Sequence, residues 1–140
     1  MSPADATRDV RFAFTHPSPA ELVDLYGGTG WGELTAEVAA RALAGSWAVC
    51  TARTPDGALV GVGRLLGDGA LHAFVTELVV HAEHRGGGVG GEILDRLVAW
   101  SRERGVHDVQ LFAARGRAPF YERHGFRARP TDAPGMDLTR

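Results

Sequence analysis

The stretch that decides the fold is Glu77-Leu78-Val79-Val80-His81-Ala82-Glu83-His84-Arg85-Gly86-Gly87-Gly88-Val89-Gly90-Gly91, in which an apolar strand end leads through a glycine loop into a helix. Five of the six residues from Gly86 to Gly91 lack a side chain, so backbone N–H groups there can approach a ligand closely. The first turn of a helix adds unpaired N–H donors and a partial positive charge. The segment therefore predicts a site for a phosphate or diphosphate, with Arg85 as a neighbouring cation.

The residues on either side of this segment predict a mixed α/β sheet. Upstream, apolar residues with a period of two, separated by Pro, Asp and Gly turns, predict antiparallel strands at 46–53, 58–66 and 70–80. Downstream, a helical stripe predicts a helix from Gly88 to Arg104, and Val109 to Ala113 returns as a parallel strand.

The remaining elements complete one expected domain over residues 1–140. We expect a strand at 10–14, a helix from the Ser18-Pro19-Ala20-Glu21 cap to Tyr26, a second helix from Thr35 to Gly45, and a short helix at 118–124. Two last strands are expected, one opening at Phe126 and one at 136–139. The expected order is β-α-α-β-β-β-α-β-α-β-β.

Composition excludes several classes of function. The 140 residues carry 15 basic and 17 acidic groups, a net charge of −2, so we expect neither nucleic acid nor a membrane surface as a partner. Every basic residue is arginine, which excludes lysine chemistry such as Schiff-base catalysis. The single Cys50 excludes an intramolecular disulfide, no residues have metal-ligand spacing, and the polar N-terminus predicts a cytoplasmic protein.

A dinucleotide site is an alternative, because Gly86, Gly88 and Gly91 satisfy G-x-G-x-x-G. Three features oppose it. The motif follows antiparallel hairpins, the segment His81-Ala82-Glu83-His84 intervenes after its strand, and the position twenty residues later is Val106, with only Asp108 nearby to bind a ribose. A flexible loop without a ligand is a further alternative.

The pattern Arg85-Gly86-Gly87-Gly88-Val89-Gly90, together with Phe120-Tyr121-Glu122-Arg123-His124-Gly125-Phe126, resembles the GCN5-related N-acetyltransferase (GNAT) family. The resemblance implies an acyl-CoA N-acyltransferase fold, with a mostly antiparallel sheet splayed between its fourth and fifth strands. It implies acetyl-CoA as co-substrate, with Leu78, Val79 and Val80 along the pantetheine and acetyl group. The pyrophosphate would lie on the loop formed by Arg85, Gly86, Gly87, Gly88, Val89, Gly90 and Gly91.

The same resemblance makes Tyr121 the general acid, and an ordinary phenol stays protonated at neutral pH. An ordinary core aromatic is the alternative for Tyr121. The chain departs from the family in having no asparagine after the strand at 109–113, so that contact is either missing or supplied otherwise, for example by Arg115 or Arg117.

The base that accepts the amine proton has two candidates, His72 and Glu77. Regular alternation puts His72, Phe74 and Thr76 on one face of the strand and Glu77 on the other, unless a bulge changes the register. We favour Glu77, because several members of the family have an acidic residue at the matching position.

The resemblance implies that acceptor specificity resides in the segment from Tyr26 to Glu33, because the matching loop faces the splay of the sheet in members of the family. Trp31 and Glu33 could bind a cationic amine through ring and carboxylate, with Tyr26 and Thr76 as further substrate-binding residues. The alternative for Trp31 is a core position over the second helix.

The sequence thus predicts an acetyl-CoA-dependent N-acetyltransferase in which a primary amine of a small molecule attacks the thioester directly. Cys50, far in sequence from the loop, is expected to be a core residue and not an acyl carrier. A non-catalytic acyl-CoA-binding module and a dinucleotide-dependent oxidoreductase remain alternatives, and a homodimer is possible.

Overall fold

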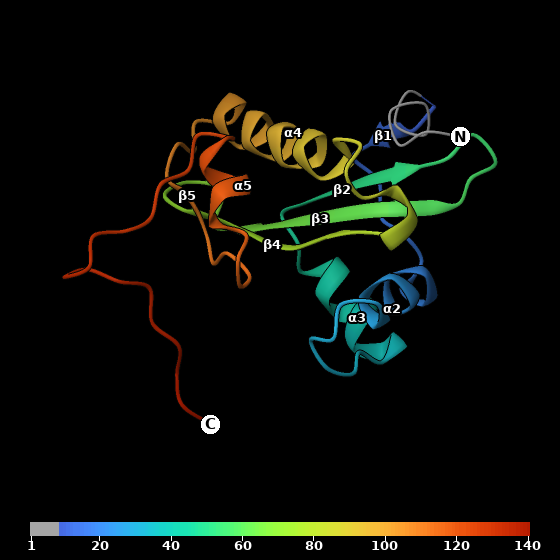
Figure 1. The fold of residues 1–140 in the computed structure, drawn as a ribbon, viewed down its shortest axis with the longest axis horizontal. Coiled ribbons are helices and arrows are strands. Elements are labelled where there is room, and N and C mark those ends of the chain that lie inside the picture. Colours follow the sequence, from blue (N-terminus) through green and yellow to red (C-terminus); the bar gives the residue numbers. More distant parts are fainter. Residues whose placement is uncertain (1–8) are drawn as a thin grey trace.

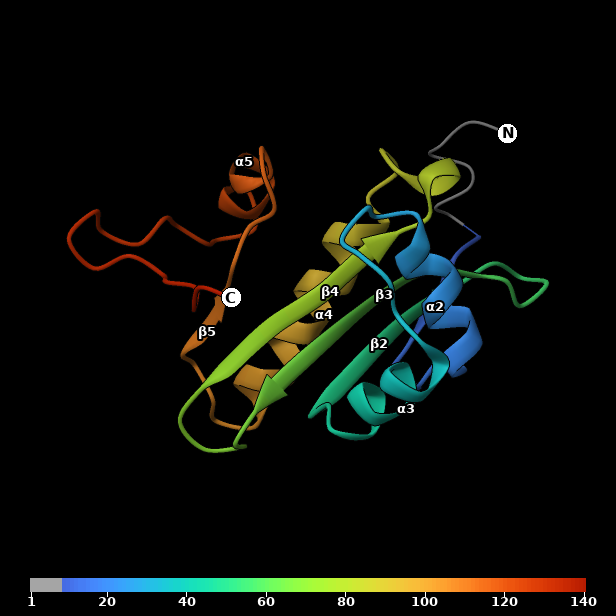
Figure 2. The ribbon, with the colours of Figure 1, turned by 90° about the horizontal axis from the view of Figure 1, so that it is seen from below.

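The computed structural model describes residues 9–140 as one five-stranded sheet with helices on both faces (Figures 1 and 2). The strands follow one another in chain order, and each neighbouring pair is antiparallel except the last, which is parallel. The strands are β1 (Arg11–Ala13), β2 (Ala48–Arg53), β3 (Leu59–Gly67), β4 (Ala73–Val80) and β5 (Val109–Leu111). The mixed sheet expected from the sequence is confirmed.

The four α-helices of residues 9–140 also lie where the sequence predicts them, within a few residues: α2 (Pro19–Gly27), α3 (Ala36–Ala44), α4 (Val89–Glu103) and α5 (Ala118–Glu122). The short 3-10 helix η1 (Ala82–His84), between β4 and the glycine loop, was not predicted. Ser18 and Thr35 cap α2 and α3, each accepting from the N–H three residues on.

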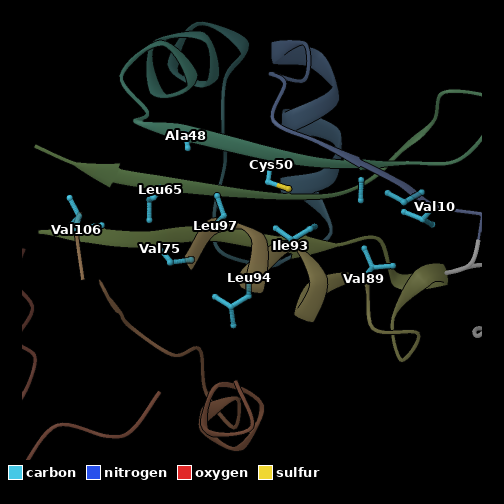
Figure 3. Packing of buried hydrophobic residues seen from close by; sticks show 13 residues of the cluster. Val10, Ala48, Cys50, Leu65, Val75, Val89, Ile93, Leu94, Leu97 and Val106 are labelled. Carbon is cyan, nitrogen blue, oxygen red and sulfur yellow. The ribbon is translucent and has the colours of Figure 1, made fainter. Parts of the chain in front are cut away.

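One face of the sheet packs against α4. Leu65 of β3, Cys50 of β2 and the α4 stripe of Ile93, Leu94 and Leu97 are fully buried together (Figure 3). The helix lies close to β3, since a Cβ on Gly63 would come within 2.7 Å of the Ile93 side chain. This cluster fixes the position of α4, and therefore of the glycine loop that precedes it.

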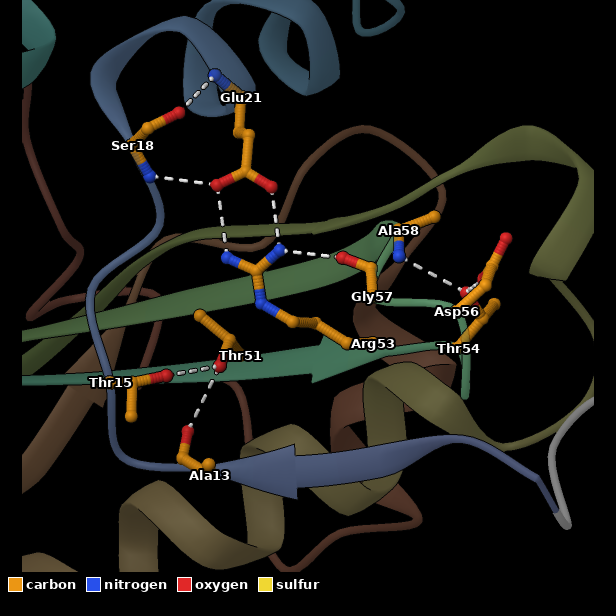
Figure 4. A network of polar contacts seen from close by, with 10 residues as sticks. All are labelled: Ala13, Thr15, Ser18, Glu21, Thr51, Arg53, Thr54, Asp56, Gly57 and Ala58. Carbon is orange, nitrogen blue, oxygen red and sulfur yellow. Dashed lines mark hydrogen bonds and ion pairs between the residues drawn. The ribbon is translucent and has the colours of Figure 1, made fainter.

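The opposite face is covered by α2 and α3, whose Leu22, Leu25 and Leu43 pack on Val62 and Val79. A polar network fixes the start of α2 to the sheet (Figure 4). Glu21 accepts from the backbone N–H of Ser18 and from both terminal nitrogens of Arg53, at 2.6 and 2.9 Å. In the same network, the hydroxyls of Thr15 and Thr51 form a hydrogen bond of 2.8 Å.

The sheet opens along β4. Within residues 9–140, β5 pairs only with the first three residues of β4, Ala73 to Val75, and the rest of β4 has β3 on one side and no strand on the other. The expected splay between the fourth and fifth strands is therefore present.

The two last strands expected at Phe126 and at 136–139 are absent from the described chain. Residues 126–140 form neither helix nor strand, and from residue 127 onward every residue is exposed, with Met136 81% and Leu138 92% accessible. Alternating residues form a strand only where a neighbouring strand accepts their hydrogen bonds, and here none does.

Candidate active site

A β-bulge interrupts β4 at the opening of the sheet. Thr76 pairs with Arg64 and Val79 pairs with Val62, so two residues, Glu77 and Leu78, stand opposite the single Gly63. Glu77 has a φ of +49°, which a side-chain-bearing residue rarely adopts. Such strain, held at one point of an otherwise regular strand, is typical of functional sites.

The bulge changes the face on which Glu77 lies. Leu78 contacts the α4 side, and Val79 packs with α2 and α3. The Glu77 carboxylate lies 3.3 Å from the Thr76 hydroxyl and 3.4 Å from a terminal nitrogen of Arg64. Regular alternation, which would put Glu77 and Thr76 on different faces of the strand, does not hold here. The bulge that the sequence analysis allowed for adds one residue to β4 and shifts the alternation after Thr76.

The glycine loop leads into α4, whose start receives no capping hydrogen bond from a side chain of the described residues. Gly88, the N-cap residue, has a φ of +87°, and Gly86 has a φ of +83°. The first-turn N–H groups of α4 therefore keep their hydrogen-bonding capacity for a ligand. Arg85 folds back over the end of β4, with Nε donating to the carbonyl of Val80 at 3.0 Å.

A cleft of about 1000 Å³ joins the loop to the opening in the sheet. Its walls are β4 from Phe74 to Val80, the loop and first turns of α4, the segment after α2, the segment after β5, and α5. Arginines at 85, 115, 117 and 123 line it, and of these Arg85 belongs to the loop that precedes α4. These residues fit a coenzyme A: donors for a diphosphate at one end and a long, partly apolar channel from there to the bulge.

Tyr121 lines the same cleft from α5. Its ring is half-buried against Phe120 and Phe126, at centroid distances of 5.0 and 6.1 Å. Burial raises the pKa of the Tyr121 phenol above its usual value of 10, and the nearby Arg117 opposes this shift in part. The phenol is therefore protonated at neutral pH and able to donate.

The structure brings most of the residues selected from the sequence into this cleft. They are Trp31, Thr76, Glu77, Leu78, Val79, Val80, Arg85, Gly86, Gly88, Val89, Gly90, Gly91 and Tyr121. Trp31 is 47% exposed, so it is not a core residue.

Four selected residues do not line the cleft. His72 lies before β4 and binds Asp108 at 2.7 Å with its ring 70% exposed, away from the bulge. Gly87 and Glu33 lie outside the lining, and Tyr26 packs its ring edge-on to Trp31 at 5.7 Å. Of the two base candidates, only Glu77 faces the opening.

The sequence did not single out several lining residues. Phe74 and Phe112 meet edge-on at 5.0 Å, with Phe112 58% exposed, and they form an aromatic part of the cleft wall. Phe74 could have been found from alternation with Thr76. Phe112, Asp95 and His124 enter the cleft only through the tertiary arrangement.

Among the helices formed by residues 9–140, none combines the length and apolarity that crossing a membrane requires.

Comparisons with known proteins agree with this architecture. Residues 44–128 match the family model described as an acetyltransferase (GNAT) domain. A solved GNAT family acetyltransferase from Streptococcus pneumoniae superposes with a TM-score of 0.81 at 27% identity, over 94% of this chain and 98% of that one.

Curated relatives point the same way. The chain is 31% identical, over 94% of its length, to "Serotonin N-acetyltransferase 2, chloroplastic" of Oryza sativa, and it spans 67% of that protein. It is 32% identical over 56% of its length to "GCN5-related N-acetyltransferase 2, chloroplastic" of Arabidopsis thaliana, of which it spans 30%. Since both relatives are named chloroplastic, the cytoplasmic location stays a prediction. With its glycine loop, bulged β4 and split sheet, this chain belongs to the GNAT family of acetyltransferases.

Proposed function

We propose that the chain transfers an acetyl group from acetyl-CoA to a primary amine of a small molecule. One observation carries the proposal: a single cleft contains an uncapped glycine-rich helix start, a strained bulge in an unpaired strand edge, and a half-buried phenol. The family to which the chain belongs supports acetyl transfer, and the acceptor is inferred from the cleft.

The cofactor would be held along two elements. First-turn amides of α4 and the arginines around them suit the diphosphate. Beyond Val75, no strand in the part of the chain that the structure describes pairs with this edge of β4, so main-chain groups on that edge can pair with the amide arm. When bound, acetyl-CoA supplies a thioester whose acetyl carbon is electrophilic.

The residues around the bulge suit direct attack by the amine. Main-chain N–H groups at the unpaired edge of β4 can bind the carbonyl oxygen as charge develops on it. The amine nitrogen bonds to the acetyl carbon while the carbon–sulfur bond breaks. Glu77, directly or through water, takes the proton from the amine, and Tyr121 gives its proton to the departing thiolate.

An acyl-enzyme on Cys50 is disfavoured. The Cys50 thiol is fully buried in the core under α4 and does not line the cleft. Burial raises its pKa to about 11, so a nucleophilic thiolate is scarce at neutral pH.

The acceptor end favours an amine with an apolar or aromatic body. Trp31, Phe74 and Phe112 supply aromatic surface, and the Glu77 carboxylate supplies the anion for an ammonium group. The name of the rice relative, a serotonin N-acetyltransferase, is consistent with an arylalkylamine.

The test is an amine panel scored by release of free thiol from acetyl-CoA. Arylalkylamines and polyamines are compared with amino acids, and the product is identified by mass spectrometry. We expect turnover with at least one aromatic amine. Binding of acetyl-CoA without thiol release for any amine would instead favour a non-catalytic acyl-CoA-binding module.

A further inference from the structure

We propose that Gly91, Asp95 and His124 form a clasp that holds α5 against α4 and so positions Tyr121 over the cleft. The proposal rests on the proposed function for the role of Tyr121, but its geometry stands independently. It also gives Gly91 a different role from its glycine neighbours: packing against His124, not contact with the cofactor.

The first observation is steric. A Cβ on Gly91 would lie 2.7 Å from Cε1 and 2.8 Å from Nε2 of His124, closer than real side chains approach. The backbone of Gly91 is ordinary α-helix, so its φ does not require glycine. The space for a side chain is taken by the His124 ring. By contrast, a Cβ on the adjacent Gly90 would meet only ordinary contacts, at 3.4 and 3.8 Å.

The second observation is polar. His124 Nδ1 lies 2.9 Å from the carboxylate of Asp95, one turn along α4 from Gly91. Only 23% of the His124 side chain is exposed, and its ring also packs on Phe120 at 5.0 Å. The His124 ring thus packs against α4 at Gly91, where no side chain is in the way, and its hydrogen bond to Asp95 holds it there.

The third observation concerns the need for such a clasp. With five residues, α5 is too short to be stable by itself, and no side chain caps its start. No strand follows it within the described residues. The backbone N–H of His124 donates to the carbonyl of Tyr121 at 3.0 Å, so fixing His124 fixes the turn that carries the phenol.

A mutant cycle tests the clasp with Gly91→Ala, His124→Ala and the double variant. In the wild-type background, Gly91→Ala should lower the melting temperature by about 5 °C through overpacking. In the His124→Ala background the same change should leave the melting temperature unchanged or raise it, because alanine is the better helix former. Gly90→Ala is the matched control for stability, and it should not lower the melting temperature.

The positioning role is read from kinetics and from NMR of the free protein. His124→Ala and Asp95→Asn should lower kcat at least tenfold while the KM for acetyl-CoA stays within a factor of two. Amide resonances of residues 118 and 120–123 should shift in both variants without any ligand. Because His124→Ala removes bulk and adds no clash, it remains informative if Gly91→Ala does not fold.

Two results would overturn the proposal. One is an equal cost of Gly91→Ala with and without His124, which would mean that the His124 ring is not the reason for a glycine at this position. The other is a His124→Ala variant with wild-type kcat and unshifted α5 amides. If no variant and not even the wild type releases thiol, the proposed function fails, while the thermal cycle and the α5 resonances still decide the clasp.

Discussion

At the scale of the single residue, Tyr121 carries the chemistry of the proposed reaction. Replacing it by Phe removes the proton donor and leaves the ring packing, so kcat should fall at least a hundredfold while the dissociation constant for acetyl-CoA is unchanged. Stopped assays and calorimetry measure the two quantities. A Tyr121→Phe enzyme with near wild-type kcat would exclude the phenol as the acid.

The pH dependence follows from the direction of the Tyr121 pKa. The reaction needs the protonated phenol, so the rate falls as pH rises through its pKa. Because burial raises that pKa above 10, the decline due to Tyr121 should lie above pH 10. The wild-type rate could instead decline near pH 8, with the decline absent in Tyr121→Phe. That result would contradict a Tyr121 phenol with a raised pKa.

The ion pair between Glu21 and Arg53 should contribute to the stability of the fold. The Arg53 guanidinium, with the Ser18 N–H, holds the pKa of Glu21 down at about 2, against 4.5 for the free side chain. Glu21→Gln keeps an acceptor for the cap and removes the charge, and it should cost roughly 1 kcal/mol at pH 7.

The sign of the pH effect follows from linkage. A carboxyl whose pKa is lowered by folding stabilises fully above its unfolded pKa and loses that contribution as pH falls. The stability difference between wild type and Glu21→Gln should therefore be constant above about pH 4.5 and shrink between 4.5 and 2. Urea unfolding across this range measures it, and a difference that grows on acidification would refute the pairing.

At the scale of the element, we expect that the bulge in β4 can be removed without loss of the fold. Deleting Glu77 would leave Thr76 and Val79 facing α2 and α3, and Leu78 and Val80 facing α4, as in a regular strand. We expect cooperative unfolding and an unchanged circular dichroism spectrum, with acetyl transfer reduced at least a hundredfold. Loss of folding, or retention of activity, would show that the bulge has another purpose.

The start of α4 gives an element-scale test of the loop. Gly88→Ala forces a left-handed φ of +87° on a residue with a side chain, so it should cost about 1 kcal/mol of stability and weaken acetyl-CoA binding. Gly87→Ala, where φ is not positive, is the control for stability. Equal stability of the two variants would mean that the loop relaxes out of its described conformation.

How far the sequence predicts these elements depends on how local their cause is. Two hairpins and the helix α4 are predicted from neighbouring residues, and the structure confirms them. The hairpin turns are Pro55-Asp56-Gly57 and Gly67-Asp68-Gly69, and the signal for α4 is its apolar stripe. The bulge does not, because nothing in Thr76-Glu77-Leu78 distinguishes it from regular alternation. It arises from the pairing of β4 with β3 and the seating of Leu78 under α4.

At the scale of the whole molecule, the site is made by an incomplete sheet. β5 leaves β4 after Val75, and the cleft fills the opening between them, lined by segments far apart in sequence such as Trp31, Glu77, Phe112 and Tyr121. The glycine loop and Tyr121 were predictable from motifs. Phe112 and His124 were not, since their place depends on how the chain crosses the sheet.

The C-terminal segment is a second case in which a local sequence pattern does not predict the structure. The alternation in Met136-Asp137-Leu138-Thr139 resembles a strand, but the described chain offers it no strand to pair with, and Leu138 is 92% exposed. Local pattern is therefore insufficient wherever a long-range partner decides the outcome.

The central claim is that acetyl-CoA lies in this cleft with its diphosphate on the start of α4 and its acyl end near Tyr121. Amide NMR of the full chain during titration with acetyl-CoA tests it most directly, with NADH as the comparison ligand. We predict saturable shifts concentrated at residues 78–80, 86–90 and 121 with acetyl-CoA, and none of comparable size with NADH. An unchanged spectrum with acetyl-CoA, or shifts confined to residues outside the cleft, would contradict the account.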